Sequence, residues 1–476
     1  MTQSRSISET QDIQNISTPI GLQLSGKYTK SFAYVTIKDR LPVILTRIID
    51  HFSRNKEAIK NIYGEESIDE IKYLIGFVSK MKNELVTNKT LKPLRLNDFT
   101  SNDEAEEWNK YLEHRIDIEG EIPTWFNTIW LYCECYMYRV LAQEISLTVK
   151  LSRYDPFEDE KQANFIQSIG SISALGSYVR HILCTCWPEN DLQTEKEEFR
   201  KLLNVSLWGN RCDLSLSAGS DASQSGDPLE VLESLKENIL SNDWEQVWNI
   251  LRDKNEAECV TIDIVLDNAG YELFTDLCLA AFLIVKNLTI KVRFYVKKYP
   301  WYVSDATLHD FYWILEQMDY LDTYPDLQLL SKMFFNFLDN EFWSLEEEPY
   351  WTSPYDFTKM KEKDVKLYEK LSTAKLVIFK GDLNYRKLLG DVNYEHITTF
   401  TNALGDFCPT NIVSLRTVKS DICVGLKPGL SELLSETDEN WMITGKYGLI
   451  QTSIFADKSN TPSEFSTCSE ENVKTL

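Results

Sequence analysis

The stretch VTIDIVLDNAGYELFTDLCLAAFLIV, residues 260–285, joins a predicted β-strand to a predicted α-helix. Residues 261–266 alternate and are rich in β-branched side chains, as is typical of a buried strand. They run into Asp267 and Asn268, and the segment beyond this polar turn is apolar at helical spacing. Polar residues between a strand and a helix lie at the carboxyl edge of an α/β sheet, where such folds bind ligands. The stretch therefore predicts an α/β fold with a site at this edge.

Asp267 and Asn268 allow two interpretations. Their side-chain oxygens suit a divalent cation or a complex of a metal with a phosphate. The same side chains can instead form an Asx turn and cap the following helix. These residues alone leave both interpretations open.

The composition bounds the class of protein. The chain has 476 residues, 43% of them apolar, which is enough for two or three domains. Its 73 acidic and 50 basic residues give a formal net charge of −23, which argues against nucleic acid or an anionic membrane as the main partner. No apolar run approaches the about 20 residues of a membrane span, and the first residues lack the apolar core of a signal peptide. We expect an intracellular, cytoplasmic protein, with the nucleus as a second compartment, and a monomer.

The cysteines and histidines do not predict a zinc site. Ten cysteines are scattered along the chain, and the two Cys-x-Cys pairs, Cys133 with Cys135 and Cys184 with Cys186, lack the Cys-x-x-Cys spacing of a zinc knuckle. The five histidines are dispersed. We expect reduced cysteines that pack in the core.

The amino-terminal part of the sequence is helical. Residues 32–203 show helical periodicity and almost no strand signal, with helices predicted at 41–52, 68–85, 125–151 and 165–186. Residues 1–19 are polar and rich in Ser, Thr, Gln and Asn. We expect a disordered tail over 1–19 and a helical domain over 20–206.

The pattern changes after this helical part. Residues 207–214 break the helical texture, 215–228 read as a flexible Ser/Gly/Asp insertion, and 229–251 are again helical. Beyond residue 285, strands alternate with helices, as in a parallel α/β sheet. Strands are predicted at 289–296, 375–379, 411–415 and within 442–454, and a helix at 306–315. We expect a catalytic α/β domain over 207–455 and a polar, disordered tail over 456–476.

Four of the predicted strands end in polar loops: Asp267-Asn268, Asp305, residues 382–386 and residues 416–419. Parallel strands deliver such loops to one edge of a doubly wound sheet. The two aspartates and the asparagine would favour Mg²⁺ or Mn²⁺. Arg386 and Lys419 suit phosphate oxygens. A metal beside a cationic phosphate clamp is what phosphoester hydrolysis needs.

Four segments resemble a known family: LWGNRCDLS at 207–215, VLDNAGYELFTDL at 265–277, VIFKGDLNYRKLLGD at 377–391 and SLRTVKSD at 414–421. They closely resemble the damage-control phosphatase family, also called domain of unknown function 89. The Arg-Thr-x-Lys element at 416–419 resembles the mark of its eukaryotic subfamily III, which includes acidic-residue-methyltransferase-like proteins. The resemblance covers about residues 28–454 and leaves out both tails and the insertion at 215–228.

The resemblance implies a helical amino-terminal domain over a three-layer α/β/α Rossmann-like domain. It implies a metal-dependent phosphatase of sugar phosphates, of the fructose 1-phosphate or fructose 6-phosphate type, that clears damaged metabolites. Mn²⁺, Co²⁺, Ni²⁺ or Mg²⁺ would bind to Asp267, Asn268 and Asp305. By its residue type alone, Asp382 is the candidate that would orient the attacking water. The residues expected to contact substrate are Asp267, Asn268, Asp382, Leu383, Asn384, Tyr385, Arg386 and Lys419.

The same resemblance leaves a second function open. Some subfamily III proteins have been described as protein-glutamate carboxyl O-methyltransferases that use S-adenosylmethionine. In that interpretation Glu272 and Asp305 would face the methyl donor. The sequence shows no glycine-rich loop after a first strand, such as many methyl-transferring Rossmann folds carry.

Overall fold

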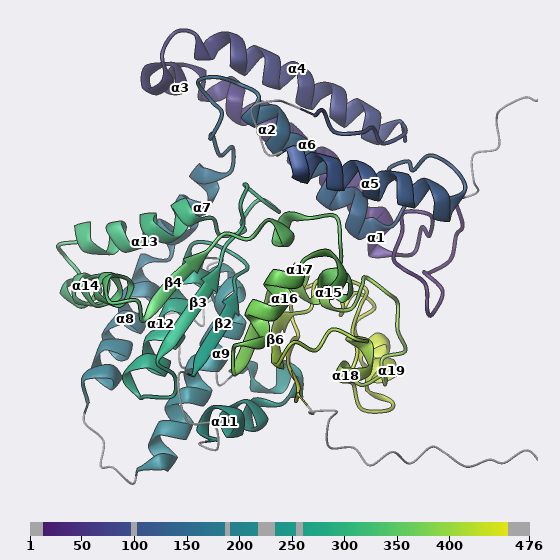
Figure 1. The fold of residues 1–476 in the computed structure, drawn as a ribbon. Helices are drawn as coiled ribbons and strands as arrows, with labels where there is room; N and C mark the ends of the chain where they lie inside the picture. The colour runs from purple at the N-terminus through teal and green to yellow at the C-terminus, as the bar shows by residue number, and fades with distance from the viewer. Residues whose placement is uncertain (1–12, 97–101, 186–190, 218–233, 254–259, 456–476) are drawn as a thin grey trace, which may run out of the picture.

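A computed structural model describes residues 13–96, 102–185, 191–217, 234–253 and 260–455 (Figure 1). A seven-stranded sheet forms its centre, in the order β1-β7-β6-β5-β2-β3-β4. All neighbouring strands are parallel except β6 and β7, which are antiparallel. The strands are β1 Ile239–Asn242, β2 Thr261–Val265, β3 Lys291–Tyr295, β4 Trp343–Glu346, β5 Leu376–Lys380, β6 Asn411–Thr417 and β7 Gly448–Ser453.

The central strand β2 is buried on both faces, as a parallel strand between two helical layers is. Ile262 and Ile264 pack into the apolar cluster on one face of the sheet. Val265 packs into the cluster on the other face. The layer that covers the first face consists of α8 Ile169–Cys184, α9 Leu192–Ser217, α11 Trp244–Arg252, α12 Tyr271–Val285, α13 Leu308–Tyr320 and α14 Pro325–Asp339.

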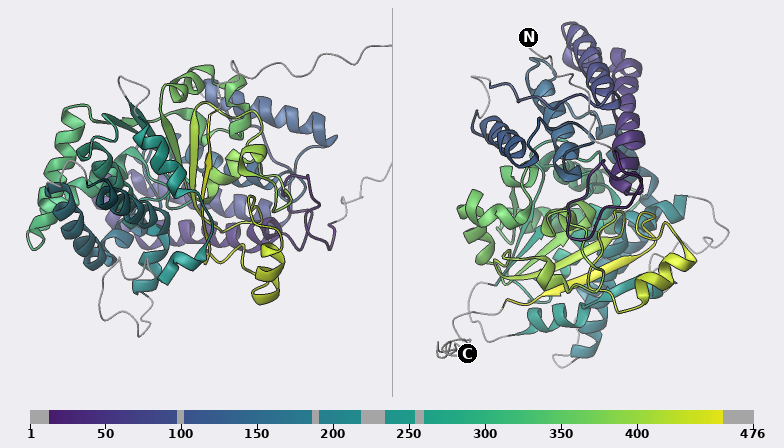
Figure 2. Two further views of the ribbon diagram at one scale, coloured as in Figure 1. Left: turned by 90° about the horizontal axis from the view of Figure 1, so that it is seen from below. Right: turned by 90° about the vertical axis from the view of Figure 1, so that its right-hand side faces the viewer.

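The opposite face is covered by short helices and by the amino-terminal helices, which share one continuous apolar cluster with the sheet. The short helices are η3 Pro349–Thr352, η4 Phe357–Lys359, α15 Met360–Lys363, α16 Val365–Ser372, α17 Gly381–Leu388, α18 Phe400–Ala403 and α19 Leu430–Thr437. The amino-terminal helices are α1 Phe32–Val35, η1 Thr36–Arg40, α2 Leu41–Arg54, α3 Lys56–Tyr63, α4 Ser67–Val86, α5 Asn102–Glu119 and α6 Trp130–Ser146. The right-hand view of Figure 2 shows this purple and blue group at one end of the molecule, and Figure 1 shows α7 Glu158–Gln167 between it and the sheet.

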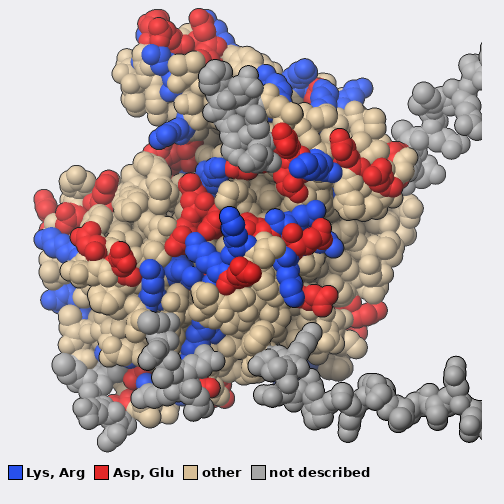
Figure 3. All heavy atoms as spheres, viewed as in Figure 1, with Lys and Arg blue, Asp and Glu red and all other residues tan. Residues whose placement is uncertain are grey.

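The expected fold class is confirmed: an α/β/α sheet domain follows an all-helical amino-terminal part. Among the described helices, none is long and apolar enough to cross a membrane. Cys133 and Cys135 are buried free thiols, as expected of core cysteines. Positive and negative side chains are interspersed on the face that carries α15 and α16 (Figure 3), so this face offers no uniformly basic surface.

The break predicted at 207–214 is wrong. These residues continue α9, which runs to Ser217. Gly209 serves the packing of α9 on α12: a Cβ there would lie 2.8 Å from Thr275 Oγ1 and 2.9 Å from Glu272 Cα. Gly209 therefore allows two helices to approach closely.

Other predicted elements differ in extent. The long helix predicted at 125–151 is α6, which begins only at Trp130, and the helix predicted at 165–186 is divided between α7 and α8 at Ser168. The helix predicted at 229–251 contains the strand β1 before α11. The edge strand β4 was not predicted.

The predicted division of the chain at 206/207 falls inside α9. Helices α8 and α9, which the sequence assigns to the helical domain, pack in the apolar cluster against the sheet. Most of the predicted insertion, residues 218–228, and most of both predicted tails, residues 1–12 and 456–476, lie outside the described residues. The described part of the insertion, 215–217, is the end of α9.

Candidate active site

The ends of β2 and β3 bring Asp267, Asn268 and Asp305 together. Asn268 and Asp305 form an isolated antiparallel bridge. The amide of Ala306 donates to the carbonyl of Asp267 at 2.8 Å, which fixes the two loops against each other. Two residues that are far apart in the sequence thus occupy one edge of the sheet, as the strand pattern predicts.

The side-chain amide of Asn268 is held in one orientation. Its Nδ2 donates to Asp267 Oδ2 and to Glu272 Oε2, both at 2.7 Å. Its Oδ1 accepts a hydrogen bond from the Ser304 hydroxyl. Asn268 therefore links β2 to α12 and to the loop that carries Asp305. An Asx turn that only caps the helix would not need the contact with this loop.

Gly381, at the start of α17, lies directly against Asp267. Its φ is +82°, and a Cβ at this position would lie 1.9 Å from Asp267 Oδ2. Any other residue would be strained in its backbone and would also displace the carboxylate. This contact places the loop after β5 beside the end of β2.

The buried carboxylates of the site carry more negative charge than the nearby lysines neutralise. Asp267, Glu272 and Asp305 are all buried. Burial, and then the charges of Glu272 and Asp305, raise the pKa of Asp267 well above its usual value. Burial raises the pKa of Asp305 to about 6 although Lys297 lies 3.2 Å from its Oδ2.

A divalent cation fits this donor set. Two carboxylates and an amide are hard oxygen donors, and a cation among them would offset the repulsion of the buried carboxylates. Within the described ranges, no group of three or more His, Cys, Asp or Glu side chains is arranged to hold a metal ion. The predicted metal ligands are not such a group because one of the three, Asn268, is an asparagine.

Lys419 is the cation of the predicted phosphate clamp that stays available. Its positive charge opposes the rise in the pKa of Asp267 that burial and the neighbouring carboxylates cause. Its main-chain amide donates to Asp382 Oδ1 at 3.3 Å, which fixes the loop after β6. Among the described residues its ammonium group has no ion pair.

Arg386 does not occupy the position expected of a phosphate clamp. Its guanidinium donates to both carboxylate oxygens of Asp391, at 2.9 and 3.0 Å, and to Glu134 Oε2 at 2.7 Å. It also lies 3.5 Å from the ring centre of Trp130. With all of these partners, Arg386 ties the loop after β5 to α6 rather than offering a free fork to a ligand.

Asp382 is also engaged by the protein. Arg416 Nε donates to Asp382 Oδ1 at 2.7 Å, and the Ser420 hydroxyl donates to the same oxygen at 3.2 Å. Burial alone would raise the pKa of Asp382, but Arg416 and Arg386 hold it below its usual value. Asp382 is therefore a charged anchor for the loop that carries Lys419.

The remaining residues of the segment 382–386 also support the loop. Asn384 Nδ2 donates to the carbonyl of Lys380 at 2.7 Å, and the Tyr385 hydroxyl donates to Gln451 Oε1 at 2.9 Å. Leu383 packs in the apolar cluster. Their side chains hold α17 in place, so a ligand at this segment would meet the main-chain amides of its first turn.

Sequence reasoning missed the buried Lys380, the last residue of β5. Its ammonium donates to Asp276 Oδ1 at 2.7 Å and lies 3.4 Å from Glu272 Oε1. Glu272, the candidate for methyl-donor binding, is thus held between Lys380 and Asn268. The sequence did contain a signal for this residue: a lysine at the end of an otherwise apolar predicted strand, next to an acidic loop.

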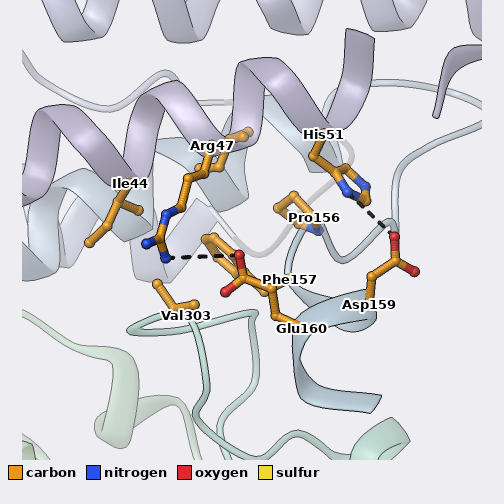
Figure 4. A pocket seen from close by; sticks show the side chains of 9 residues that line it. Ile44, Arg47, His51, Pro156, Phe157, Asp159, Glu160 and Val303 are labelled. Carbon is orange, nitrogen blue, oxygen red and sulfur yellow. Dashed lines mark ion pairs between the residues drawn. The ribbon is translucent and has the colours of Figure 1, made fainter. Parts of the chain in front are cut away.

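The amino-terminal helices position the turn before Asp305. Tyr302 and Val303 both have positive φ, 44° and 70°, which is a strained conformation for residues with a Cβ. The Tyr302 hydroxyl donates to Glu134 of α6 at 3.1 Å. Figure 4 shows Val303 facing Ile44 of α2 across a small pocket.

Two ion pairs that are also drawn in Figure 4 join α2 to the start of α7. Arg47 Nη1 lies 4.0 Å from Glu160 Oε1, and His51 Nδ1 lies 3.5 Å from Asp159 Oδ2. Both are exposed at the carboxylate and add little stability. Ile44 and Val303 line this pocket and both pack against the same apolar cluster, so apolar packing joins α2 to the turn.

The fold and the site define an α/β protein with a buried acidic centre at the carboxyl ends of its parallel strands. A family model described as the damage-control phosphatase ARMT1-like domain matches residues 36–434. The chain is 42% identical over 440 residues to the damage-control phosphatase ARMT1 of Xenopus laevis, which covers 90% of this chain and 98% of that relative. It is 40% identical over 435 residues to the human protein of the same name, over 90% of this chain and 97% of that relative.

A crystal structure of a DUF89 family protein from Pyrococcus horikoshii is also similar, with 14% sequence identity and a TM-score of 0.38. That likeness covers 74% of this chain and 90% of the archaeal chain. The chain belongs to the damage-control phosphatase ARMT1-like family, and the resemblance inferred from its motifs is confirmed.

Proposed function

We propose that the chain is a metal-dependent phosphatase that hydrolyses sugar phosphates, of the fructose 1-phosphate or fructose 6-phosphate type. Membership of a phosphatase family supports the reaction type. The observation that carries the proposal is the meeting of Asp267, Asn268 and Asp305 at one strand edge, where the two carboxylates are buried and short of compensating positive charge.

These three side chains would hold a divalent cation, Mn²⁺, Co²⁺, Ni²⁺ or Mg²⁺. The cation would supply a Lewis acid that withdraws negative charge from the phosphate oxygens. In the structure the Nδ2 of Asn268 faces Asp267 and Glu272, and its Oδ1 accepts from the Ser304 hydroxyl, so ligation through Oδ1 would require the amide to turn over. The buried carboxylates of Asp267 and Asp305 would stabilise the cation more strongly than carboxylates in water do.

Two further features would bind the phosphate group itself. The ammonium group of Lys419 can neutralise a phosphate oxygen beside Asp267. The first turn of α17, which begins at Gly381 against Asp267, can present unpaired main-chain amides to a second oxygen. Arg386 would act indirectly, by holding the loop after β5 on α6.

Phosphate release from fructose 1-phosphate and fructose 6-phosphate, with Mn²⁺ and with EDTA, tests the proposal. Asp267→Asn should reduce the Mn²⁺-dependent rate at least about a hundredfold because it removes a ligand charge, while the urea unfolding curve shows a folded protein. Asp243→Asn is the matched control, since Asp243 follows β1, whose direction places it at the opposite edge of the sheet. Undiminished turnover in Asp267→Asn, or in EDTA, would refute metal-dependent hydrolysis at this site.

A further inference from the structure

Asp421 joins the loop after β6 to the start of the amino-terminal helices. Its Oδ2 accepts a hydrogen bond from the Ser31 hydroxyl at 2.8 Å and another from the main-chain amide of Phe32 at 2.5 Å. Asp421 stands two residues after Lys419, whose ammonium group is the proposed ligand of the substrate phosphate. One carboxylate oxygen therefore connects the Lys419 loop to residues that lie 389 and 390 positions earlier in the chain.

This contact caps a helix. Phe32 is the first residue of α1, and Ser31 is its N-cap, whose hydroxyl oxygen also accepts from the amide of Ala33 at 3.3 Å. Helical backbone continues without a break from Phe32 through α1, η1 and α2 to Arg54. The first amides of a helix lack partners within it, and a carboxylate beside them is favourable. The first helical run of the amino-terminal part is thus capped by a residue of the sheet domain.

The segment before α1 is itself fixed to the molecule. The amide of Asn393 donates to the carbonyl of Leu22 at 2.8 Å, and the amide of Leu24 donates to the carbonyl of Asp391 at the same distance. The amide of Trp130, the first residue of α6, donates to the carbonyl of Leu24, also at 2.8 Å. The segment is therefore held by the loop after α17 and by α6, and it can serve as a support for the Lys419 loop.

The sheet domain holds the same loop through other residues. The Ser420 hydroxyl donates to Asp382 Oδ1 at 3.2 Å and accepts from Arg416 Nη2 at 2.9 Å. The stem of Lys419 runs past Gly445, where a Cβ would lie 3.4 Å from the Cε and 3.7 Å from the Cγ of the lysine. These contacts fix the loop to the sheet, and Asp421 provides its support on the amino-terminal helices.

We propose that Asp421 is a positioning residue, which through Ser31 and Phe32 holds the loop after β6 where the Lys419 ammonium group meets the substrate phosphate. The role rests on the proposed function, in which Lys419 neutralises a phosphate oxygen. Displacing a group that binds substrate by about 1 Å can cost about a hundredfold in rate. Asp421 itself does not bind the phosphate, because its Oδ2 already has two donors and because a carboxylate and a phosphate repel each other.

A double-mutant cycle with Lys419 tests whether Asp421 acts through it. In calorimetry of the full chain with Mg²⁺, Asp421→Ala should bind inorganic phosphate about tenfold more weakly than the wild type, and Lys419→Met should lose at least as much. The double variant should bind as weakly as Lys419→Met alone, within about twofold, because no ammonium group is left to misplace. A residue that only stabilises the fold would give losses that multiply. The same cycle is measured in kcat/KM for fructose 1-phosphate.

Two further variants test the hydrogen bonds themselves. Asp421→Asn keeps an oxygen that can accept from both donors, so it should retain at least about a third of the wild-type affinity for phosphate. Ser31→Ala removes one of the two hydrogen bonds from the side of α1 and should weaken phosphate binding about threefold. Because Ser31→Ala leaves the loop after β6 unchanged in sequence, it decides the question even where Asp421→Ala does not fold.

Glu70→Ala is the matched control. Glu70 of α4 also accepts main-chain amides of a distant segment, those of Val149, Lys150 and Leu151. Figure 1 shows α4 on the side of the helical part that faces away from the sheet. Glu70→Ala should lower the melting temperature, as Asp421→Ala does, but leave the affinity for phosphate and kcat/KM unchanged.

Several results would overturn the assignment. These are a wild-type protein that does not bind phosphate, an unchanged affinity in Asp421→Ala or Ser31→Ala, losses that multiply in the double variant, and an Asp421→Asn variant as weak as Asp421→Ala. An equal loss of affinity in Glu70→Ala would also contradict it. Because the phosphate titrations require no turnover, a wild type that binds phosphate but does not hydrolyse fructose phosphates would remove the proposed function, while the titrations would still decide whether Asp421 acts through Lys419.

Discussion

At the scale of single residues, the site depends on contacts that leave no room for a side chain. Gly381 has a left-handed backbone and touches the carboxylate of Asp267. The glycine brings the end of β5 and the end of β2 close enough to share one ligand. The position of Asp267 is thus set by its neighbour across the sheet as well as by its own strand.

Gly381→Ala should therefore reduce both stability and turnover by more than its backbone strain alone would. We expect a loss of about 1–3 kcal/mol in the free energy of unfolding and more than a tenfold loss of Mn²⁺-dependent phosphate release, because the new methyl group displaces Asp267. Gly405→Ala is the control: its φ is +57°, but nothing lies within 4 Å of a Cβ there. It should cost about 1 kcal/mol and leave turnover unchanged. Equal effects on turnover in the two variants would contradict the steric argument.

The residues that sequence reasoning placed correctly are those whose position follows from strand direction. Asp267, Asn268 and Asp305 come directly after parallel strands or shortly beyond them, so the fold alone gathers them. Arg386 shows the limit of this reasoning. Its residue type suggested a phosphate clamp, but it pairs with Asp391, five positions later, and with Glu134, 252 positions earlier, and a single sequence does not reveal the distant pair.

At the scale of secondary structure elements, long periodic segments were predicted well and short or glycine-containing ones were not. Strands β2, β3, β5 and β6 were all expected, whereas the four-residue strands β1 and β4 at the two edges of the sheet were missed. Short edge strands carry too few residues for a period to show. The break predicted at 207–214 is wrong because residue types alone do not show that Gly209 packs against α12.

Two helical glycines should respond in opposite directions to alanine. In Gly209→Ala the Cβ would meet the backbone of α12 at Glu272, so we expect a loss of about 1–3 kcal/mol in the free energy of unfolding. Gly76 of α4 is exposed, and a Cβ there meets nothing within 4 Å. Gly76→Ala should therefore stabilise the protein by up to about 1 kcal/mol. Urea unfolding of both variants checks this, and a Gly209→Ala variant as stable as the wild type would show that α9 and α12 can move apart.

At the scale of the whole molecule, the helical part completes the site. The turn before Asp305 is strained; its Val303 lines a pocket with Ile44 of α2, and its Tyr302 donates to Glu134 of α6. Arg386 connects the loop after β5 to the same helix α6. The change from helical to strand periodicity along the sequence predicted the general architecture. It did not predict the contacts of α6 with Tyr302 and Arg386, because these join residues more than a hundred positions apart.

The central claim is that the loops after β2 and β3 form one metal site. Anomalous diffraction from crystals of the full chain grown with Mn²⁺ tests it most directly. We predict a single strong peak within about 2.0–2.3 Å of oxygen atoms of Asp267, Asn268 and Asp305. That peak should be absent in Asp267→Asn crystals grown under the same conditions. Manganese bound elsewhere, with these three side chains arranged as they are here and no peak between them, would contradict the account.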